Sequence, residues 1–107
     1  MEVKVSEKEG VVIFQIDGEI NISTTLELKK RLETHLSKKI VMDLEKMKYI
    51  DSSGLAALLE VLKKVKSQGG SLILVGMSDK VKSLFEITKL DKLFLIFRNQ
   101  AEALSQV

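Results

Sequence analysis

The sequence predicts an α/β fold: a mostly parallel, mixed sheet of four to five strands with an N-terminal edge hairpin and about four helices. Two observations carry this prediction. Short apolar runs rich in branched and aromatic residues have the length of strands, and the segments between them show helical spacing of apolar residues. Strand and helix alternate three times, which is typical of right-handed crossovers and a parallel sheet. With 107 residues, we expect a single domain over residues 1–107.

The first strand is expected around Val3 and Val5, which alternate with polar residues as in an edge strand. Glu9 and Gly10 predict a turn that pairs it with the next strand as a hairpin. The remaining strands are four apolar runs, Val11–Phe14, Ile40–Met42, Leu72–Val75 and Phe94–Phe97. Because these runs are apolar at successive positions, we expect strands that are covered on both faces or central in the sheet.

Four segments show helical spacing of apolar residues, and they extend from about Thr24 to Ser37, from Ser53 to about Gln68, from about Asp79 to Thr88, and from Asn99 onward. Gly69 and Gly70 are expected to end the second helix. Ser78 is the predicted N-cap of the third. Asn99 and Glu102 have the spacing of a capping box at the start of the last.

The composition is that of an ordinary soluble globular protein, with 45% hydrophobic and 30% charged residues. A net charge of +2 gives no electrostatic reason to expect direct contact with nucleic acid. The absence of cysteine excludes disulfides and thiolate metal sites. No apolar run approaches the ~20 residues that span a bilayer, and the N-terminus lacks the apolar centre of a signal peptide. We therefore expect a cytoplasmic protein without direct membrane contact.

The segment Asp51-Ser52-Ser53-Gly54 directly precedes the second predicted helix. Backbone N–H groups in the first turn of a helix lack intrahelical partners and carry the positive end of the helix dipole, so a phosphate on either serine would be favoured there. Asp and Ser are also the commonest N-capping residues, and a glycine suits a helix start. The residues alone leave both interpretations open.

A second polar group, Asp17-Gly18-Glu19, follows the apolar run Val11–Phe14, at the expected carboxyl end of a strand. Sites form at this edge in open α/β sheets. In a sequential sheet, residues 17–23 would lie beside Ser52 and form one surface with it. The alternative is a plain loop in which Ser23 or Thr24 caps the first helix.

The sequence does not favour an enzyme. Its single histidine, His35, lies on the first predicted helix beside Leu36 and can anchor neither a metal cluster nor a catalytic triad by itself. The surroundings of Ser52 differ from the Gly-x-Ser-x-Gly elbow of hydrolases, and no histidine follows it. No Walker-type loop occurs. We expect no cofactor and no metal.

Four segments resemble, in order and spacing, the anti-sigma-factor antagonist family, which is built on the STAS fold. They are Gly18-Glu19-Ile20, Asp51-Ser52-Ser53-Gly54-Leu55, Gly76 and Leu90-Asp91-Lys92-Leu93-Phe94. The resemblance implies that Ser52 is a phosphorylation site and that Asp51, Ser53 and Gly54 complete a recognition segment. It further implies a switch that, when unphosphorylated, binds an anti-sigma factor with serine kinase activity and frees the sigma factor. A serine phosphatase would reset the switch.

The chain departs from the family pattern at Asn21. After Gly-Glu-hydrophobic, the antagonists usually carry aspartate, and asparagine keeps its shape but loses its charge. Asn21 is therefore a candidate partner-binding residue at which we expect phosphorylation kinetics or partner choice to differ from those of the family. Glu19, which matches the family pattern, is a second candidate partner-binding residue. A second interpretation of the same resemblance is a scaffolding subunit of a membrane transport complex, in which the serine region docks without phosphorylation. A serine hydrolase is a third, opposed by the missing histidine.

Overall fold

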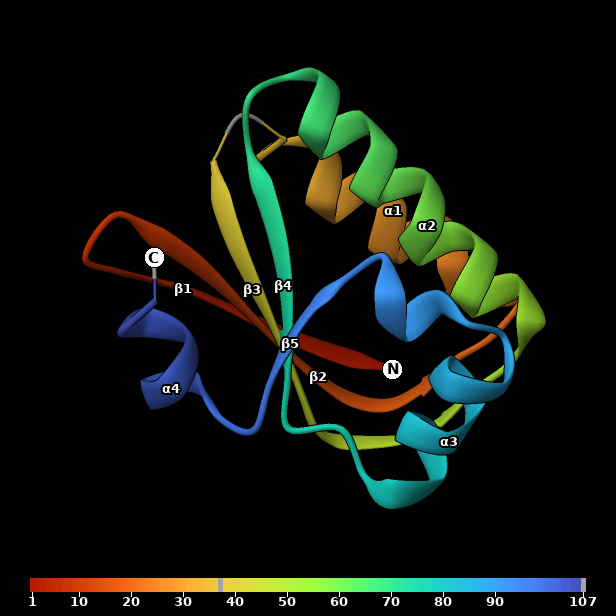
Figure 1. Cartoon of the computed structure of the whole chain (residues 1–107). Helices are drawn as coiled ribbons and strands as arrows, with labels where there is room; N and C mark the ends of the chain where they lie inside the picture. The colour runs from red at the N-terminus through yellow and green to blue at the C-terminus, as the bar shows by residue number, and fades with distance from the viewer. Residues whose placement is uncertain (37, 107) are drawn as a thin grey trace.

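The strands lie in one sheet in the order in which they occur in the sequence, as the computed structural model shows for residues 1–36 and 38–106 (Figure 1). The first pair is antiparallel and the other three are parallel. The elements are β1 (Glu2–Lys8), β2 (Val11–Ile20), α1 (Thr25–Glu33), β3 (Lys39–Ile50), α2 (Ser52–Ser67), β4 (Ser71–Val75), α3 (Asp79–Ile87), a 3-10 turn (Leu90–Lys92), β5 (Leu95–Phe97) and α4 (Gln100–Leu104). The predicted α/β class, edge hairpin and number of helices are confirmed.

The sequential strand order explains where the helices lie. Right-handed crossovers between neighbouring parallel strands all turn the same way, so α1, α2 and α3 lie on one face of the sheet (Figure 1). This face holds the larger apolar core, which includes Phe14, Met42, Leu58 and Phe85. Of the helices in the described residues, only α4 covers the other face, where Ala103 packs with the smaller cluster of Val11, Ile13, Val41, Ile73 and Val75.

Burial on both faces is confirmed for the runs in β2, β3 and β4 and is wrong for the last run. Strand β5 lies at the edge of the sheet, and Leu95 is 58% exposed. Phe94 precedes the strand and is buried against Phe85. A continuous apolar run therefore reflects two different roles here: one side chain fills the core, and the next lies at an edge.

Strands β2 and β3 are longer than the sequence predicted. Their pairing continues to Ile20 and Ile50, with register shifts between Gln15 and Asp17 and between Gly18 and Glu19. Asp17, Gly18 and Glu19 lie in the carboxyl-terminal part of β2, as expected from their predicted position at the end of a strand, and the alternative of a plain loop at these residues is wrong. The segment has a polar sequence typical of a loop because the second half of β2 leaves the side chains of Asp17 and Glu19 exposed to water.

The predicted starts of α3 and α4 are confirmed. Ser78 and Asn99 cap α3 and α4, since their side-chain oxygens accept the N–H groups of Val81 (3.2 Å) and Glu102 (2.8 Å). Helix α1 ends at Glu33, before the expected end at Ser37, which lies outside the described residues. No helix in the described parts of the chain combines the length and apolarity needed to cross a bilayer.

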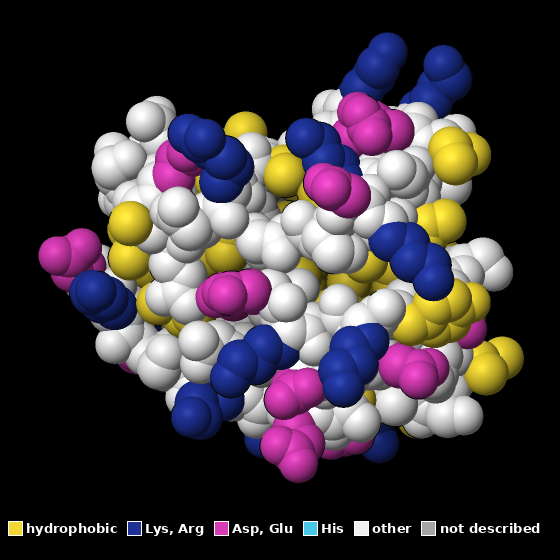
Figure 2. Space-filling model, turned by 90° about the horizontal axis from the view of Figure 1, so that it is seen from below, with side chains coloured by type: hydrophobic (Ala, Val, Ile, Leu, Met, Phe, Trp, Pro, Cys, Tyr) yellow, Lys and Arg dark blue, Asp and Glu magenta, His cyan; other side chains and the backbone are white. Residues whose placement is uncertain are grey.

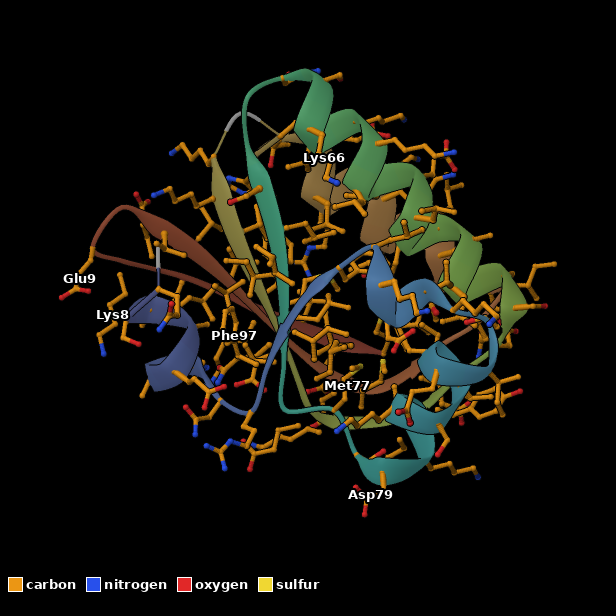
Figure 3. The ribbon with its side chains drawn as sticks, in the orientation of Figure 1. Lys8, Glu9, Lys66, Met77, Asp79 and Phe97 are labelled. Atoms are coloured by element: carbon orange, nitrogen blue, oxygen red, sulfur yellow. The ribbon has the colours of Figure 1, made fainter. Side chains whose placement is uncertain are left out.

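A buried carboxylate attaches α4 to the sheet. Asp43 of β3 is 8% exposed, and its two oxygens accept hydrogen bonds from the Gln100 side chain (2.7 Å) and the Glu45 backbone (3.0 Å). Phe97 lies on the side of the sheet that faces α4 (Figure 3). Because both carboxylate oxygens are hydrogen-bonded, Asp43 attaches α4 to this face without an unpaired polar atom.

Helix α2 is held along its length. Its buried stripe includes Leu58, Val61, Leu62 and Val65, which pack between the sheet and α1. On the surface, Lys29 of α1 pairs with Glu60 of α2 (3.0 Å). Exposed pairs of this kind contribute little to stability, so the apolar stripe is the main reason that the start of α2 has a fixed position.

Candidate functional site

The start of α2 is organised by Asp51, its N-cap. Asp51 has an extended backbone, and its Oδ1 accepts hydrogen bonds from the Gly54 N–H (2.9 Å) and the Ser53 hydroxyl (2.5 Å). Ser52 is the first residue of the helix and is exposed, whereas Ser53 is half-buried. Among the described residues, the Ser52 side chain makes no hydrogen bond with another protein group. The two serines, adjacent in sequence, therefore differ in their surroundings.

Gly54 allows this helix start to approach β2 closely. A Cβ atom at this position would lie 2.6 Å from Cγ1 of Ile50, and 2.8 and 2.9 Å from the carbonyl oxygen and Cγ2 of Ile20. The Asp51 N–H donates to the same Ile20 oxygen at 3.2 Å. Gly54 is buried, so the structure gives this predicted partner-binding residue a positioning role beneath the surface.

The hydrogen bonds at Asp51 also stabilise its charged form. The Ser53 hydroxyl, which donates to it, holds the pKa of Asp51 below its usual value, and the Gly54 N–H lowers this pKa further. The backbone N–H of Ile22, in the loop between β2 and α1, adds to the lowering. Hydrogen bonds to the charged form favour that form, so Asp51 carries its charge at neutral pH.

The loop after β2 is a hydrogen-bonded turn built on Asn21. Its side-chain oxygen accepts the Ser23 N–H (2.9 Å), and its carbonyl oxygen accepts the N–H groups of Thr24 and Thr25 (both 3.0 Å). Its own N–H donates to the Thr24 hydroxyl at 2.9 Å. Thr24 occupies the N-cap position of α1 without capping it through its side chain. Asn21 therefore shapes the loop, and its NH2 group reaches Glu19 at 3.4 Å.

The structure brings the two predicted segments together. Glu19 and Ile20 pair with Tyr49 and Ile50 in the sheet, and Ile20 contacts the start of α2 as described above. Figure 2 looks onto the edge at which β2, β3 and β4 end, where acidic and basic side chains are interspersed. Hydrophobic side chains gather toward the right of that view, the side of α1, α2 and α3 in Figure 1.

Sequence reasoning missed three exposed apolar residues around this site. Ile22, Leu26 and Tyr49 are 79%, 60% and 42% exposed and lie in the loop after β2, in the first turns of α1 and near the end of β3. The sequence offered one indication of this exposure, since Ile22 is a single apolar residue between the polar Asn21 and Ser23 in a predicted loop.

Away from the start of α2, the described residues hold no metal-binding cluster, and the single histidine packs against an aromatic ring. His35 packs edge-to-face against Phe14, with ring centroids 5.6 Å apart, so it is a structural residue. Within residues 1–36 and 38–106, no group of three or more His, Cys, Asp or Glu side chains is placed to hold a metal ion. What the described site offers chemically is an exposed hydroxyl at a helix N-terminus beside a carboxylate.

Comparisons with known proteins agree with this fold. The model of the STAS domain family matches residues 2–103. The anti-sigma-B factor antagonist of Listeria monocytogenes is 31% identical, over 95% of this chain and 91% of its own. That of Bacillus subtilis is 33% identical over 84% of each chain. The crystal structure of an anti-sigma factor antagonist from Mycobacterium paratuberculosis has 25% identity and a TM-score of 0.89, covering 99% of this chain and 92% of the other. The chain belongs to the STAS domain family.

Proposed function

We propose that this protein is an anti-sigma factor antagonist without enzymatic activity. In its unphosphorylated form it binds an anti-sigma factor that is also a serine kinase, and so releases the sigma factor. The kinase phosphorylates Ser52, the complex weakens, and a serine phosphatase restores the binding form. The observation that carries the proposal is the exposed Ser52 hydroxyl at the start of α2, on a domain whose relatives are named anti-sigma factor antagonists.

The local structure suits a switch of this kind. A phosphoserine adds about −1.5 to −2 charge at pH 7. At the first position of α2 this charge meets the positive end of the helix dipole, so the fold tolerates it. A partner that covers Ser52 together with the exposed apolar Ile22 would instead have to desolvate the charge next to Asp51. Phosphorylation would thus act on the complex and spare the fold.

Affinity capture from the source cell tests the proposal. Wild-type protein and Ser52→Asp serve as paired baits, and mass spectrometry identifies the bound proteins. We expect an anti-sigma factor with a serine kinase domain on the wild-type bait and its loss from the aspartate bait. Ser83→Asp, which places the same charge on an exposed serine of α3, is the matched control. A transporter component retained equally by both baits would contradict the proposal and favour a scaffolding role.

The first prediction concerns the acceptor. We expect the kinase to phosphorylate Ser52 and leave Ser53 unmodified, because the Ser52 hydroxyl is exposed whereas the Ser53 hydroxyl donates a hydrogen bond to Asp51. Incubation with the captured kinase and ATP, followed by fragmentation mass spectrometry, locates the phosphate. Modification mainly at Ser53 or elsewhere would show that the assignment is wrong.

The second prediction concerns Asn21→Asp. The aspartate keeps the oxygen that accepts the Ser23 N–H, so we expect an unchanged fold. It adds a carboxylate that can attract the Mg²⁺ accompanying ATP. We therefore expect faster phosphorylation of Ser52, by up to about tenfold, or about 1.4 kcal/mol in the barrier.

Parallel kinase assays on wild type and Asn21→Asp measure this effect. Ser23→Asp, which places the same charge two residues further along the loop, is the control for charge alone. Equal rates for wild type and Asn21→Asp would mean that asparagine at this position is neutral for the reaction.

A further inference from the structure

Ser52 and Ser53 are adjacent serines at the start of α2. A kinase that phosphorylated both would produce mixtures of phosphorylated forms in place of one defined non-binding form. We propose that Asp51 directs phosphorylation to Ser52 by engaging the Ser53 hydroxyl, so that one of the two serines is withdrawn as an acceptor. This inference rests on the proposed function and adds a specificity-determining role for Asp51 and Ser53.

The contacts at Asp51 carry the inference. The Ser53 hydroxyl donates to Oδ1 of Asp51 at 2.5 Å, a short distance typical of a hydrogen bond to an ionised acceptor. The same oxygen accepts the Gly54 N–H, which closes the cap of α2. Ser53 is half-buried in this arrangement, and Ser52 is exposed on the outer side of the same turn. The carboxylate that caps the helix therefore also accepts a hydrogen bond from the hydroxyl of Ser53.

Withdrawal of Ser53 follows from the chemistry of transfer. In the reaction at Ser52, its oxygen bonds to the γ-phosphorus of ATP, the bond between that phosphorus and the β,γ-bridging oxygen breaks, ADP leaves, and the hydroxyl proton passes to a base of the kinase. The same reaction at Ser53 would first break its bond to Asp51. It would then place an anionic phosphoryl group on an oxygen that lies 2.5 Å from Oδ1 of Asp51, which is electrostatically unfavourable.

Asp51 is also a poor base for activating Ser53. Hydrogen bonds from Ser53 and Gly54 hold the pKa of Asp51 below its usual value, so the carboxylate has little tendency to take up a proton. A general base works best when its pKa is near the working pH. The short contact therefore holds the Ser53 proton without transferring it.

The test uses Asp51→Ala and Asp51→Asn, each phosphorylated by the kinase captured above and mapped by fragmentation mass spectrometry. Asp51→Ala removes the acceptor, and we expect the share of phosphate on Ser53 to rise at least about tenfold, equivalent to about 1.4 kcal/mol of lost discrimination. Asp51→Asn keeps an oxygen that can accept from Ser53 and Gly54, and we expect it to retain the preference for Ser52. Circular dichroism of both variants serves as the control for folding, and we expect spectra like that of the wild type.

A second measurement tests the contact without a kinase. We expect Ser53→Ala to raise the pKa of Asp51 toward its usual value, because the largest cause of its lowering is removed. Carbon-13 NMR titration of the Asp51 carboxyl in wild type and Ser53→Ala measures this change. An unchanged pKa would overturn the inference.

The outcomes separate the inference from the proposed function. If the captured kinase modifies Ser52 alone in both wild type and Asp51→Ala, the proposed function stands and the selective role of Asp51 is wrong. If no kinase is captured, or wild type accepts no phosphate, the proposed function is wrong, and the NMR titration still decides whether Asp51 engages Ser53.

Discussion

Alanine in place of Gly54 will destabilise the domain, although alanine is the better helix former. Helix propensity alone favours alanine over glycine by about 1 kcal/mol. The added Cβ, however, would lie 2.8 Å from the backbone oxygen of Ile20, and strand β2 is fixed by its pairing with β3. Forcing an extra methyl group into a close-packed site costs typically ~1–3 kcal/mol. We therefore expect a net loss in the free energy of unfolding.

Urea denaturation of wild type and Gly54→Ala measures this loss as a lower midpoint with an unchanged slope. Ala56→Gly is the matched control, because Ala56 lies two residues further along α2 and is exposed. It should lose only about 0.5–1 kcal/mol through propensity. Equal or greater stability of Gly54→Ala would show that α2 can move away from β2 and that the close approach is not required.

Aspartate in place of Ser52 will sharply weaken partner binding, whereas alanine will preserve it. An interface that packs around a neutral hydroxyl must desolvate the new charge beside Asp51. Leaving a charge buried and unpaired in an interface costs about 2–5 kcal/mol, which raises Kd at least about 30-fold. Ser52→Ala removes only the hydroxyl, so it should bind like wild type and resist phosphorylation.

Calorimetry of wild type, Ser52→Ala and Ser52→Asp with the captured partner measures these affinities. Amide NMR shifts of the phosphorylated form should change near the start of α2 and the loop after β2, with the rest of the sheet unaffected. Wild-type affinity in the aspartate variant, or shift changes throughout the sheet, would contradict a local switch.

Much of the fold was predictable because its signals are local. The stripe of leucines in α2, the capping residues Ser78 and Asn99, and the turn at Gly10 are each properties of a few neighbouring residues, and the structure confirms them. The cap at Asp51 was likewise open to prediction, since its partners, Ser53 and Gly54, lie within three residues.

The rest depends on tertiary contacts. The sequence shows a glycine at position 54 but not the Ile20 carbonyl oxygen that excludes a side chain there. Glu19 reads as part of a loop because its side chain is polar, although its backbone pairs with Tyr49. Leu95 is exposed because β5 lies at the edge of the sheet. The order of the strands determines this position, and the apolar character of the run does not reveal it.

The hydrogen bonds that converge on Asp51 have a consequence for recognition. The Asp51 side chain accepts hydrogen bonds from the Ser53 hydroxyl and the Gly54 N–H, and its own backbone N–H donates to the Ile20 oxygen. The end of β2 and the start of α2 are therefore positioned together around Ser52. An enzyme that acts on Ser52 would meet an assembled, three-dimensional epitope. A short synthetic peptide spanning this serine would lack half of that epitope, and both the kinase and the phosphatase would have to recognise the folded domain.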